Sequence, residues 1–213
     1  MTFWVFAYLA RDAALLEAIR TETLPGVVND SPDVPYLTGQ CPRLEALYLE
    51  VLRLEMSSSL MRYVTEPTMI GGKLLREGNN VMVPYRQLHY SEDIWGENAS
   101  AFDPERFLRK KGLSRSSSFR PFGGGQHLCP GRFLAKQAVF TFVALALSRF
   151  DVRLDTDSGM GETGGASKNR VQRFPRADES KPGLGALAPV AGDGVILRLK
   201  PRTTSVEKPL ARS

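Results

Sequence analysis

The apolar positions of this chain recur mostly at the three- and four-residue spacing of an α-helix. That spacing predicts helices over residues 3–22, 44–54 and 132–150, and a break near Asp12 splits the first of them, with Asp12 capping its second half. Shorter apolar runs between glycine-containing turns predict strands at residues 69–70, 73–75, 81–83 and about 195–199. The pattern therefore predicts a mainly α chain with small β-sheets, an α+β fold.

Stretches rich in Pro, Gly, Ser or charge separate these elements. We expect a connection over residues 24–42, a meandering polar stretch over 91–107, an exposed loop over 110–118 and a mobile loop over 155–168. The core side of the last long helix is assigned to its apolar positions Phe133, Val139, Phe140, Val143, Ala144 and Leu147. Residues 1–205 are expected to form one domain, and 206–213 a disordered tail.

Composition narrows the class of protein. A hydrophobic content of 42% in 213 residues indicates a globular chain, and two cysteines do not make a disulfide framework, which fits an intracellular, reducing compartment. The formal charge of +5 is mild and forms no basic stripe with interleaved aromatics, so nucleic acid is not an expected partner. The apolar run 138–147 is too short to cross a bilayer, and no membrane span is predicted.

The sequence FGGGQHLCPG, residues 122–131 and hereafter the Cys loop, is the candidate functional site. Three glycines precede Cys129, and Pro130 and Gly131 lead into the last long helix. Glycines allow backbone angles and close approaches that other residues do not. A helix N-terminus also favours a thiolate over a thiol. A buried, inert cysteine is the alternative that a lone Cys before a helix would normally suggest.

The flanking residues favour the functional reading. The loop matches the pattern Phe-x-x-Gly-x-His/Arg-x-Cys-x-Gly at every fixed position, with Phe122, Gly125, His127, Cys129 and Gly131. It resembles the haem-binding loop of the cytochrome P-450 superfamily. The resemblance implies that Cys129 is the axial thiolate ligand of haem iron. It also implies that Phe122 packs beside the sulfur, that the glycines lie under the porphyrin, and that His127 reaches a haem propionate.

Two more motifs carry the same resemblance. Glu50 and Arg53 lie three apart and off the apolar face of their helix, a spacing that by itself predicts an exposed ion pair worth about 0.2–0.5 kcal/mol. It is also the spacing of the superfamily's Glu-x-x-Arg motif, with Arg106 in FDPERF as the third partner. The resemblance implies a buried structural network of these three. It places Arg62 at a haem propionate, while His89 is interpreted as a structural histidine.

The resemblance implies a function as well as a fold. The chain looks like the C-terminal part of a eukaryotic, fungal-type cytochrome P-450. The family's oxygen-activating motif has no counterpart in it, so no catalytic residue is identified. The implied activity is that of a haem-thiolate monooxygenase, which inserts one oxygen atom of O2 into a small, lipophilic organic substrate. Electrons would come from an NADPH-dependent flavoprotein reductase, which a set of basic residues could dock: Arg109, Lys110, Lys111, Arg115, Arg120 and Lys136.

Further implications concern the substrate side and the membrane. Residues 57–60 and 182–189 fall where relatives contact substrate. Full-length relatives are usually anchored in the endoplasmic reticulum membrane, and no such anchor is expected in this chain. Two other functions stay open: a truncated, catalytically incompetent relative that binds haem weakly or not at all, and an enzyme that isomerises or dehydrates an oxygenated substrate without a reductase.

Overall fold

The computed structural model describes residues 1–155, 173–180 and 185–202, except for the side chain of His127. The α-helices are α1 (Thr2–Leu9), α2 (Ala13–Thr23), α3 (Val34–Gln40), α4 (Pro42–Glu55), α5 (Tyr85–His89), α6 (Glu92–Trp95), α7 (Arg106–Arg109) and α8 (Arg132–Arg149). Short 3-10 turns occupy Leu24–Gly26, Leu113–Arg115 and Gly125–His127. The strands are β1 (Val27–Val28), β2 (Ser31–Pro32), β3 (Ser59–Tyr63), β4 (Thr68–Ile70), β5 (Lys73–Leu75), β6 (Asn80–Pro84), β7 (Phe150–Leu154) and β8 (Leu197–Pro201). A mainly α fold with small β-sheets is confirmed.

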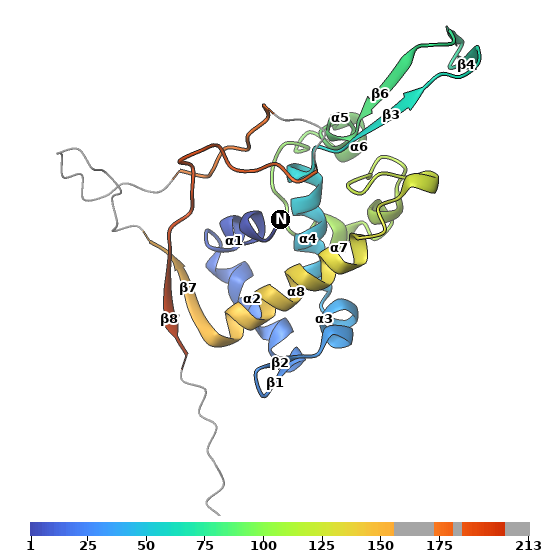
Figure 1. The fold of residues 1–213 in the computed structure, drawn as a ribbon. Coiled ribbons are helices and arrows are strands. Elements are labelled where there is room, and N and C mark those ends of the chain that lie inside the picture. The colour runs from blue at the N-terminus through green and yellow to red at the C-terminus, as the bar shows by residue number, and fades with distance from the viewer. Residues whose placement is uncertain (156–172, 181–184, 203–213) are drawn as a thin grey trace, which may run out of the picture.

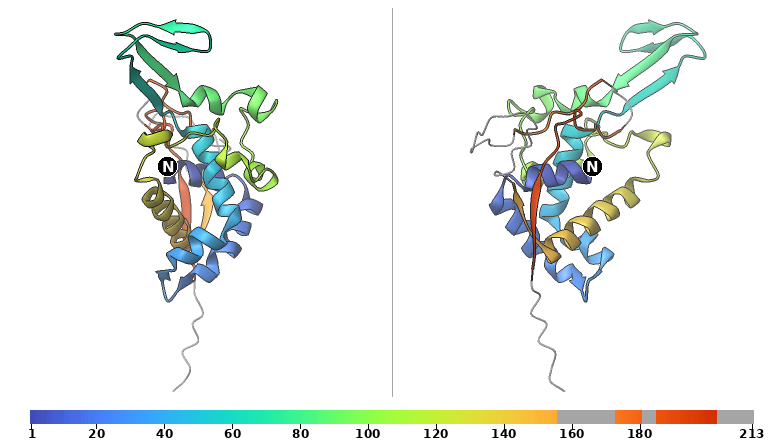
Figure 2. Two further views of the ribbon diagram at one scale, coloured as in Figure 1. Left: turned by 90° about the vertical axis from the view of Figure 1, so that its right-hand side faces the viewer. Right: turned by 60° about the vertical axis from the view of Figure 1, so that its left-hand side comes forward.

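The strands form separate two-stranded antiparallel ribbons: β1–β2, β3–β6, β4–β5 and β7–β8. The β3–β6 ribbon, with β4–β5 at its tip, projects from the helical body (Figures 1 and 2). The β7–β8 ribbon lies on the other side of the body, where α8 runs directly into β7 (Figure 1). Helices therefore supply the core, and the ribbons lie at its margins.

Helix α4 is the centre of that core. It packs against α1, α2, α5 and α7, while α8 crosses below it and packs against α3, α2 and α1 (Figure 1). Large side chains without solvent exposure fill the space between these helices: Trp4, Leu9, Ile19, Leu37, Leu44, Leu47, Leu52, Phe140 and Leu147. Burial of such side chains is the main stabilising term, at roughly 1.5–3 kcal/mol each.

Carboxylates fix where the helices begin. Asp12 is the N-cap of α2, and its carboxylate accepts the Leu15 N–H at 2.8 Å, as the sequence predicted. Asp33 caps α3 in the same way. The α4 N-terminus has no cap of its own, and Glu22 of α2 accepts the N–H groups of Arg43 and Leu44 at 2.9 Å each. This long-range cap joins α2 to the start of the central helix.

Several local elements differ from the sequence prediction. The expected connection 24–42 contains the β1–β2 hairpin and helix α3, strand β3 lies where no strand was predicted, and 85–89 is a helix. Phe133, assigned to the core, is 62% exposed, whereas the other core positions predicted on α8 are buried. Phe133 stands in the first turn of α8, ahead of the part that crosses α4, and the Arg132 guanidinium covers its ring at 4.1 Å.

Other expectations concern residues outside the described part. The loop at 155–168 lies almost wholly there, as does the tail 206–213, so the mobility of both and the 1–205 domain boundary stay predictions. Within the described ranges, no helix is both long and apolar enough to cross a membrane.

Two glycines test the packing beside α3. An alanine Cβ at buried Gly26 would lie 2.6 Å from Tyr36 Cδ1 and 2.7 Å from Leu37 Cδ2, whereas one at Gly39 would meet nothing within 4 Å. We expect Gly26→Ala to lower the free energy of unfolding by about 1–3 kcal/mol through overpacking. Gly39→Ala, in a helix, should leave it unchanged or raise it by up to about 1 kcal/mol. Urea unfolding measures both, and equal effects would contradict the predicted packing.

Candidate functional site

The Cys loop is a tight turn closed by its own backbone. The Cys129 N–H donates to the Phe122 carbonyl at 3.0 Å, and a 3-10 turn at Gly125–His127 lies between them. Gly123 (φ 82°) and Gly125 (φ 63°) have left-handed backbones that disfavour other residues. Helix α8 begins three residues after Cys129. As predicted, a glycine-rich turn delivers one thiol to the start of a helix.

Cys129 is partly exposed, and apolar residues lie near it in the sequence. Cys129 is half-buried and forms no disulfide. Its carbonyl accepts the Arg132 guanidinium at 2.9 Å, and a Cβ on Gly131 would lie 3.7 Å from its sulfur. Leu128, Phe133 and Leu134 nearby are exposed by 38%, 62% and 70%. The loop therefore presents a half-buried cysteine that is close in sequence to exposed apolar side chains.

Glu50, Arg53 and Arg106 come together in a buried group, hereafter the Glu50 cluster. Arg53 donates to both carboxylate oxygens of Glu50, from Nε to Oε2 at 2.9 Å and from Nη2 to Oε1 at 2.7 Å. Arg106 Nε reaches Oε1 at 3.2 Å, and the Asp103 N–H donates to the same atom at 3.1 Å. Glu50 and Arg53 have no solvent exposure. The exposed ion pair that spacing alone suggests is therefore wrong.

The remaining guanidinium donors of the Glu50 cluster bind main-chain carbonyls. Arg53 donates to the carbonyls of His89, Ala99 and Ala101, and its guanidinium lies 5.2 Å from the Trp95 ring. Arg106 donates to carbonyls at 95, 98 and 101. The excess positive charge of the cluster is thus spread over carbonyl dipoles and an aromatic face. The meandering stretch 91–107 is held by these bonds.

His89 lies between the Glu50 cluster and the approach to the Cys loop. Its ring has no solvent exposure, lies 5.5 Å from the Phe119 ring, and accepts the Arg120 N–H on Nε2 at 3.0 Å. Among the described residues, Nδ1 has no hydrogen-bond partner. Burial, and then the positive charge of Arg53, lower the pKa of His89 to about 4. His89 is thus a buried structural histidine, as expected, with one ring nitrogen hydrogen-bonded. The sequence pattern did not indicate that the Arg120 N–H is the partner of this nitrogen.

The predicted substrate-side segments lie side by side. The Ser57 N–H donates to the Gly185 carbonyl at 2.8 Å, the Leu187 N–H donates to the Glu55 carbonyl at 2.8 Å, and Met56 pairs with Ala186. Residues 181–184 of the predicted turn lie outside the described part. These contacts bring together chain segments about 130 apart in sequence, as expected for one surface.

The structure does not bring all predicted site residues together. Arg62 lies exposed on β3, and its guanidinium donates to the adjacent Met61 carbonyl at 2.8 Å. The predicted role of the His127 side chain lies outside what the structure describes. Phe122 is half-buried and packs against the core. The geometry thus joins Phe122 and Cys129 directly and leaves Arg62 on the projecting ribbon.

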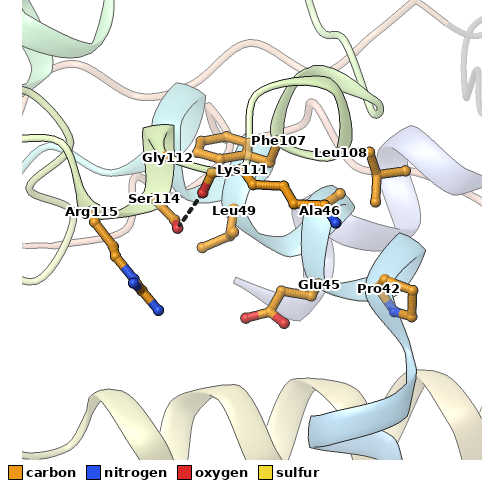
Figure 3. Close-up of a pocket in the computed structure, with 10 residues that line it drawn as sticks. All are labelled: Pro42, Glu45, Ala46, Leu49, Phe107, Leu108, Lys111, Gly112, Ser114 and Arg115. Carbon is orange, nitrogen blue, oxygen red and sulfur yellow. Dashed lines mark hydrogen bonds between the residues drawn. The ribbon is translucent and has the colours of Figure 1, made fainter.

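The predicted basic face is partly occupied by internal ion pairs. Arg109 pairs with Asp103 and Glu105, and Lys136 Nζ lies 2.8 Å from Glu45 Oε1. Lys111 and Arg115 line a groove of about 530 Å³ between α4 and residues 107–115 (Figure 3). Its other lining residues are Pro42, Glu45, Ala46, Leu49, Phe107, Leu108, Gly112 and Ser114. The groove has apolar and polar residues in its lining, and both basic groups and the Glu45 carboxylate stand at its wall.

The Glu50 cluster predicts a sharp contrast between two arginines. Arg53→Lys removes the planar fork that binds Glu50 and three carbonyls, so the free energy of unfolding should fall by about 3–5 kcal/mol. Arg109→Lys, at a side chain 56% exposed, should cause little measurable change because lysine keeps a screened surface charge. Denaturant unfolding of both variants measures the difference. Similar losses would mean that the buried cluster does not hold the fold.

Comparison with known proteins places this geometry in a family. The profile of the family Cytochrome P450 matches residues 1–165. The chain is 34% identical over 170 residues to the cytochrome P450 monooxygenase calL of Penicillium decumbens, covering 72% of this chain and 32% of that protein. It is 32% identical over 167 residues to a cytochrome P450 monooxygenase of Gibberella zeae, covering 70% and 32%.

An animal relative gives a similar match. The steroid 17-alpha-hydroxylase/17,20 lyase of Oryzias latipes is 34% identical over 152 residues, covering 69% of this chain and 29% of that protein. The chain therefore spans about a third of the length of the curated relatives it matches. Because the family profile covers most of the sequence and relatives match at these identities, the chain belongs to the cytochrome P450 family.

Proposed function

We propose that this chain is the haem-carrying part of a haem-thiolate monooxygenase, with Cys129 as the axial ligand of the iron. The observation that carries the proposal is the Cys loop, in which a partly accessible thiol stands at the start of α8 within the family's own motif. A single thiolate suits a metal whose other ligands are the porphyrin nitrogens. When bound, haem with a thiolate ligand supplies O–O bond cleavage and oxygen transfer.

The described residues fit a flat, apolar group. A macrocycle needs a close approach to the main chain, and an added Cβ at Gly125 would meet nothing within 4 Å, which leaves open space beside the loop. The exposed side chains of Leu128, Phe133 and Leu134 provide apolar surface beside Cys129 in sequence. A bound macrocycle would remove such surface from water, which favours its binding. This fit supports the proposal independently of the motif.

The chain's own residues fix the backbone of Cys129 at the start of α8. The N-terminus of α8 directs unpaired N–H groups and a positive partial charge toward the turn that carries Cys129. The Cys129 N–H and carbonyl are fixed by Phe122 and Arg132. We further propose that His127 and Arg62 bind the haem propionates; Arg62 is exposed on the β3 ribbon, where its long side chain can reorient.

The electron donor and substrate are proposed from the same assignment. We propose an NADPH-dependent flavoprotein reductase as donor, docking through the exposed Lys110, Lys111 and Arg115, because electrostatic complementarity speeds association. A small lipophilic compound is the proposed substrate class, with residues 57–60 and the described part of the second segment, 185–189, on its side of the haem. The joined backbones of these two segments support a shared surface.

A chain that does not hold haem stably is the second candidate. The observation that favours it is the apolar surface left uncovered on α8, together with a match to about a third of the relatives' length. Such surface normally packs against other protein. In that case the Glu50 cluster would still hold the fold, without a functional thiolate.

The two free cysteines provide a matched test. We expect the chain, expressed with a haem precursor, reduced and treated with carbon monoxide, to show a strongly red-shifted Soret band. Cys129→Ala should abolish that band by removing the thiolate. Cys41→Ala should keep it, because Cys41 is buried beside the Glu22 carbonyl and its thiol pKa is raised to about 11 by burial. Absence of haem uptake, or a band unchanged by Cys129→Ala, would refute the proposal.

A further inference from the structure

His89 contacts both the Glu50 cluster and the segment that enters the Cys loop. Its carbonyl accepts Arg53 Nη1 at 2.7 Å, and its ring Nε2 accepts the Arg120 N–H at 3.0 Å. The ring has no solvent exposure, so this second bond is shielded from competing water. One residue thus joins the most buried charges of the fold to the backbone just ahead of Phe122.

The bond requires one protonation state of the ring. Nε2 accepts a hydrogen bond only when the imidazole is neutral and its proton is on Nδ1. The charged groups facing the ring are Arg53 from α4 and Arg86 from α5, and both disfavour a second positive charge. Protonation would turn Nε2 into a donor facing the Arg120 N–H, and the bond would be lost.

Hydrogen bonds fix the backbone at three consecutive positions, residues 120–122, between His89 and Cys129. The Arg120 N–H is held by His89, the Pro121 carbonyl accepts Ser58 Oγ at 3.1 Å, and the Phe122 carbonyl accepts the Cys129 N–H at 3.0 Å. The path from Arg53 to Cys129 is therefore a series of short contacts. Loss of the hydrogen bond between the His89 ring and the Arg120 N–H would loosen the backbone of residues 120 and 121, which leads into the Cys loop.

We propose that His89 is a positioning residue for Cys129: its neutral ring fastens the Cys loop to the Glu50 cluster. The consequence for a bound haem rests on the proposed function, whereas the tie itself is a property of the chain without haem. A side chain that merely filled space beside Phe119 would need no nitrogen at this position. The two roles therefore predict different effects of glutamine and leucine.

The first experiment needs no haem. In a Cys41→Ala background, the alkylation rate of Cys129 is compared for the parent, His89→Leu and His89→Gln. Glutamine offers Oε1 to the Arg120 N–H, and leucine offers no acceptor. We expect leucine to raise the rate about three- to tenfold, the equivalent of one buried hydrogen bond, and glutamine to stay within about twofold of the parent. A leucine variant at the parental rate, or a glutamine variant as fast as leucine, overturns the proposal.

The second experiment follows the red-shifted carbon monoxide band during acidification. Protonation of the cysteine is common to all variants, so the difference between them reports on His89. The unsubstituted chain should lose the band at a higher pH than His89→Gln, because glutamine does not titrate. Identical profiles overturn the proposal. Failure to bind haem in every chain would refute the proposed function while leaving the alkylation result intact.

A third measurement uses the chain without substitution, in case the variants fold poorly. Nitrogen-15 chemical shifts of the His89 ring at neutral pH distinguish the two neutral tautomers. The proposal requires the proton on Nδ1 and an unprotonated Nε2 that accepts the Arg120 N–H. A proton on Nε2 overturns it.

Discussion

The fold depends on one carboxylate without solvent exposure, that of Glu50. Glu50 on α4 is stable there because Arg53 and Arg106 bind it, and each guanidinium has donors left over for carbonyls. Those carbonyls belong to residues 89–101, a stretch with little regular secondary structure to satisfy them. Buried carbonyls need donors. The Glu50 cluster thus replaces the missing sheet or helix bonds of the meander and binds it to the central helix.

The same arrangement determines how the candidate site is supported. The Cys loop has few contacts of its own, since its glycines lack side chains and its backbone closes locally through Phe122 and Cys129. Its support comes from both ends. Residues 120 and 121 are bound to His89 and Ser58, and α8 continues into the core through Phe140 and Leu147. A glycine-rich turn is thereby held between two packed elements, an arrangement typical of ligand-binding loops.

Sequence patterns predicted the long helices because an apolar face repeats over several turns, as in α4 and the second half of α8. They missed β3 and α5, which are five residues each and lack a clear period. They placed Phe133 in the core because periodicity identifies a face but not what covers it. Spacing alone could not predict that Glu50 is buried either, because the second positive charge comes from Arg106 on α7, 53 residues after Arg53 in the sequence. The Arg120–His89 bond left no sequence signal, since a backbone N–H is the donor.

Helix α8 shows how ligation and turnover place different demands on the chain. The helix packs against α3, α2 and α1, and positions such as Val143 are buried, while Leu134 and Phe142 are 70% and 56% exposed. An apolar hollow of about 330 Å³ beside Phe142 and β7 continues this uncovered side. A helix that is apolar on all sides normally lies in a protein interior. Under the proposed function, thiolate ligation needs only the Cys loop and its supports. Turnover also needs water excluded from the reacting face, so we expect cover over α8 to govern activity separately from ligation.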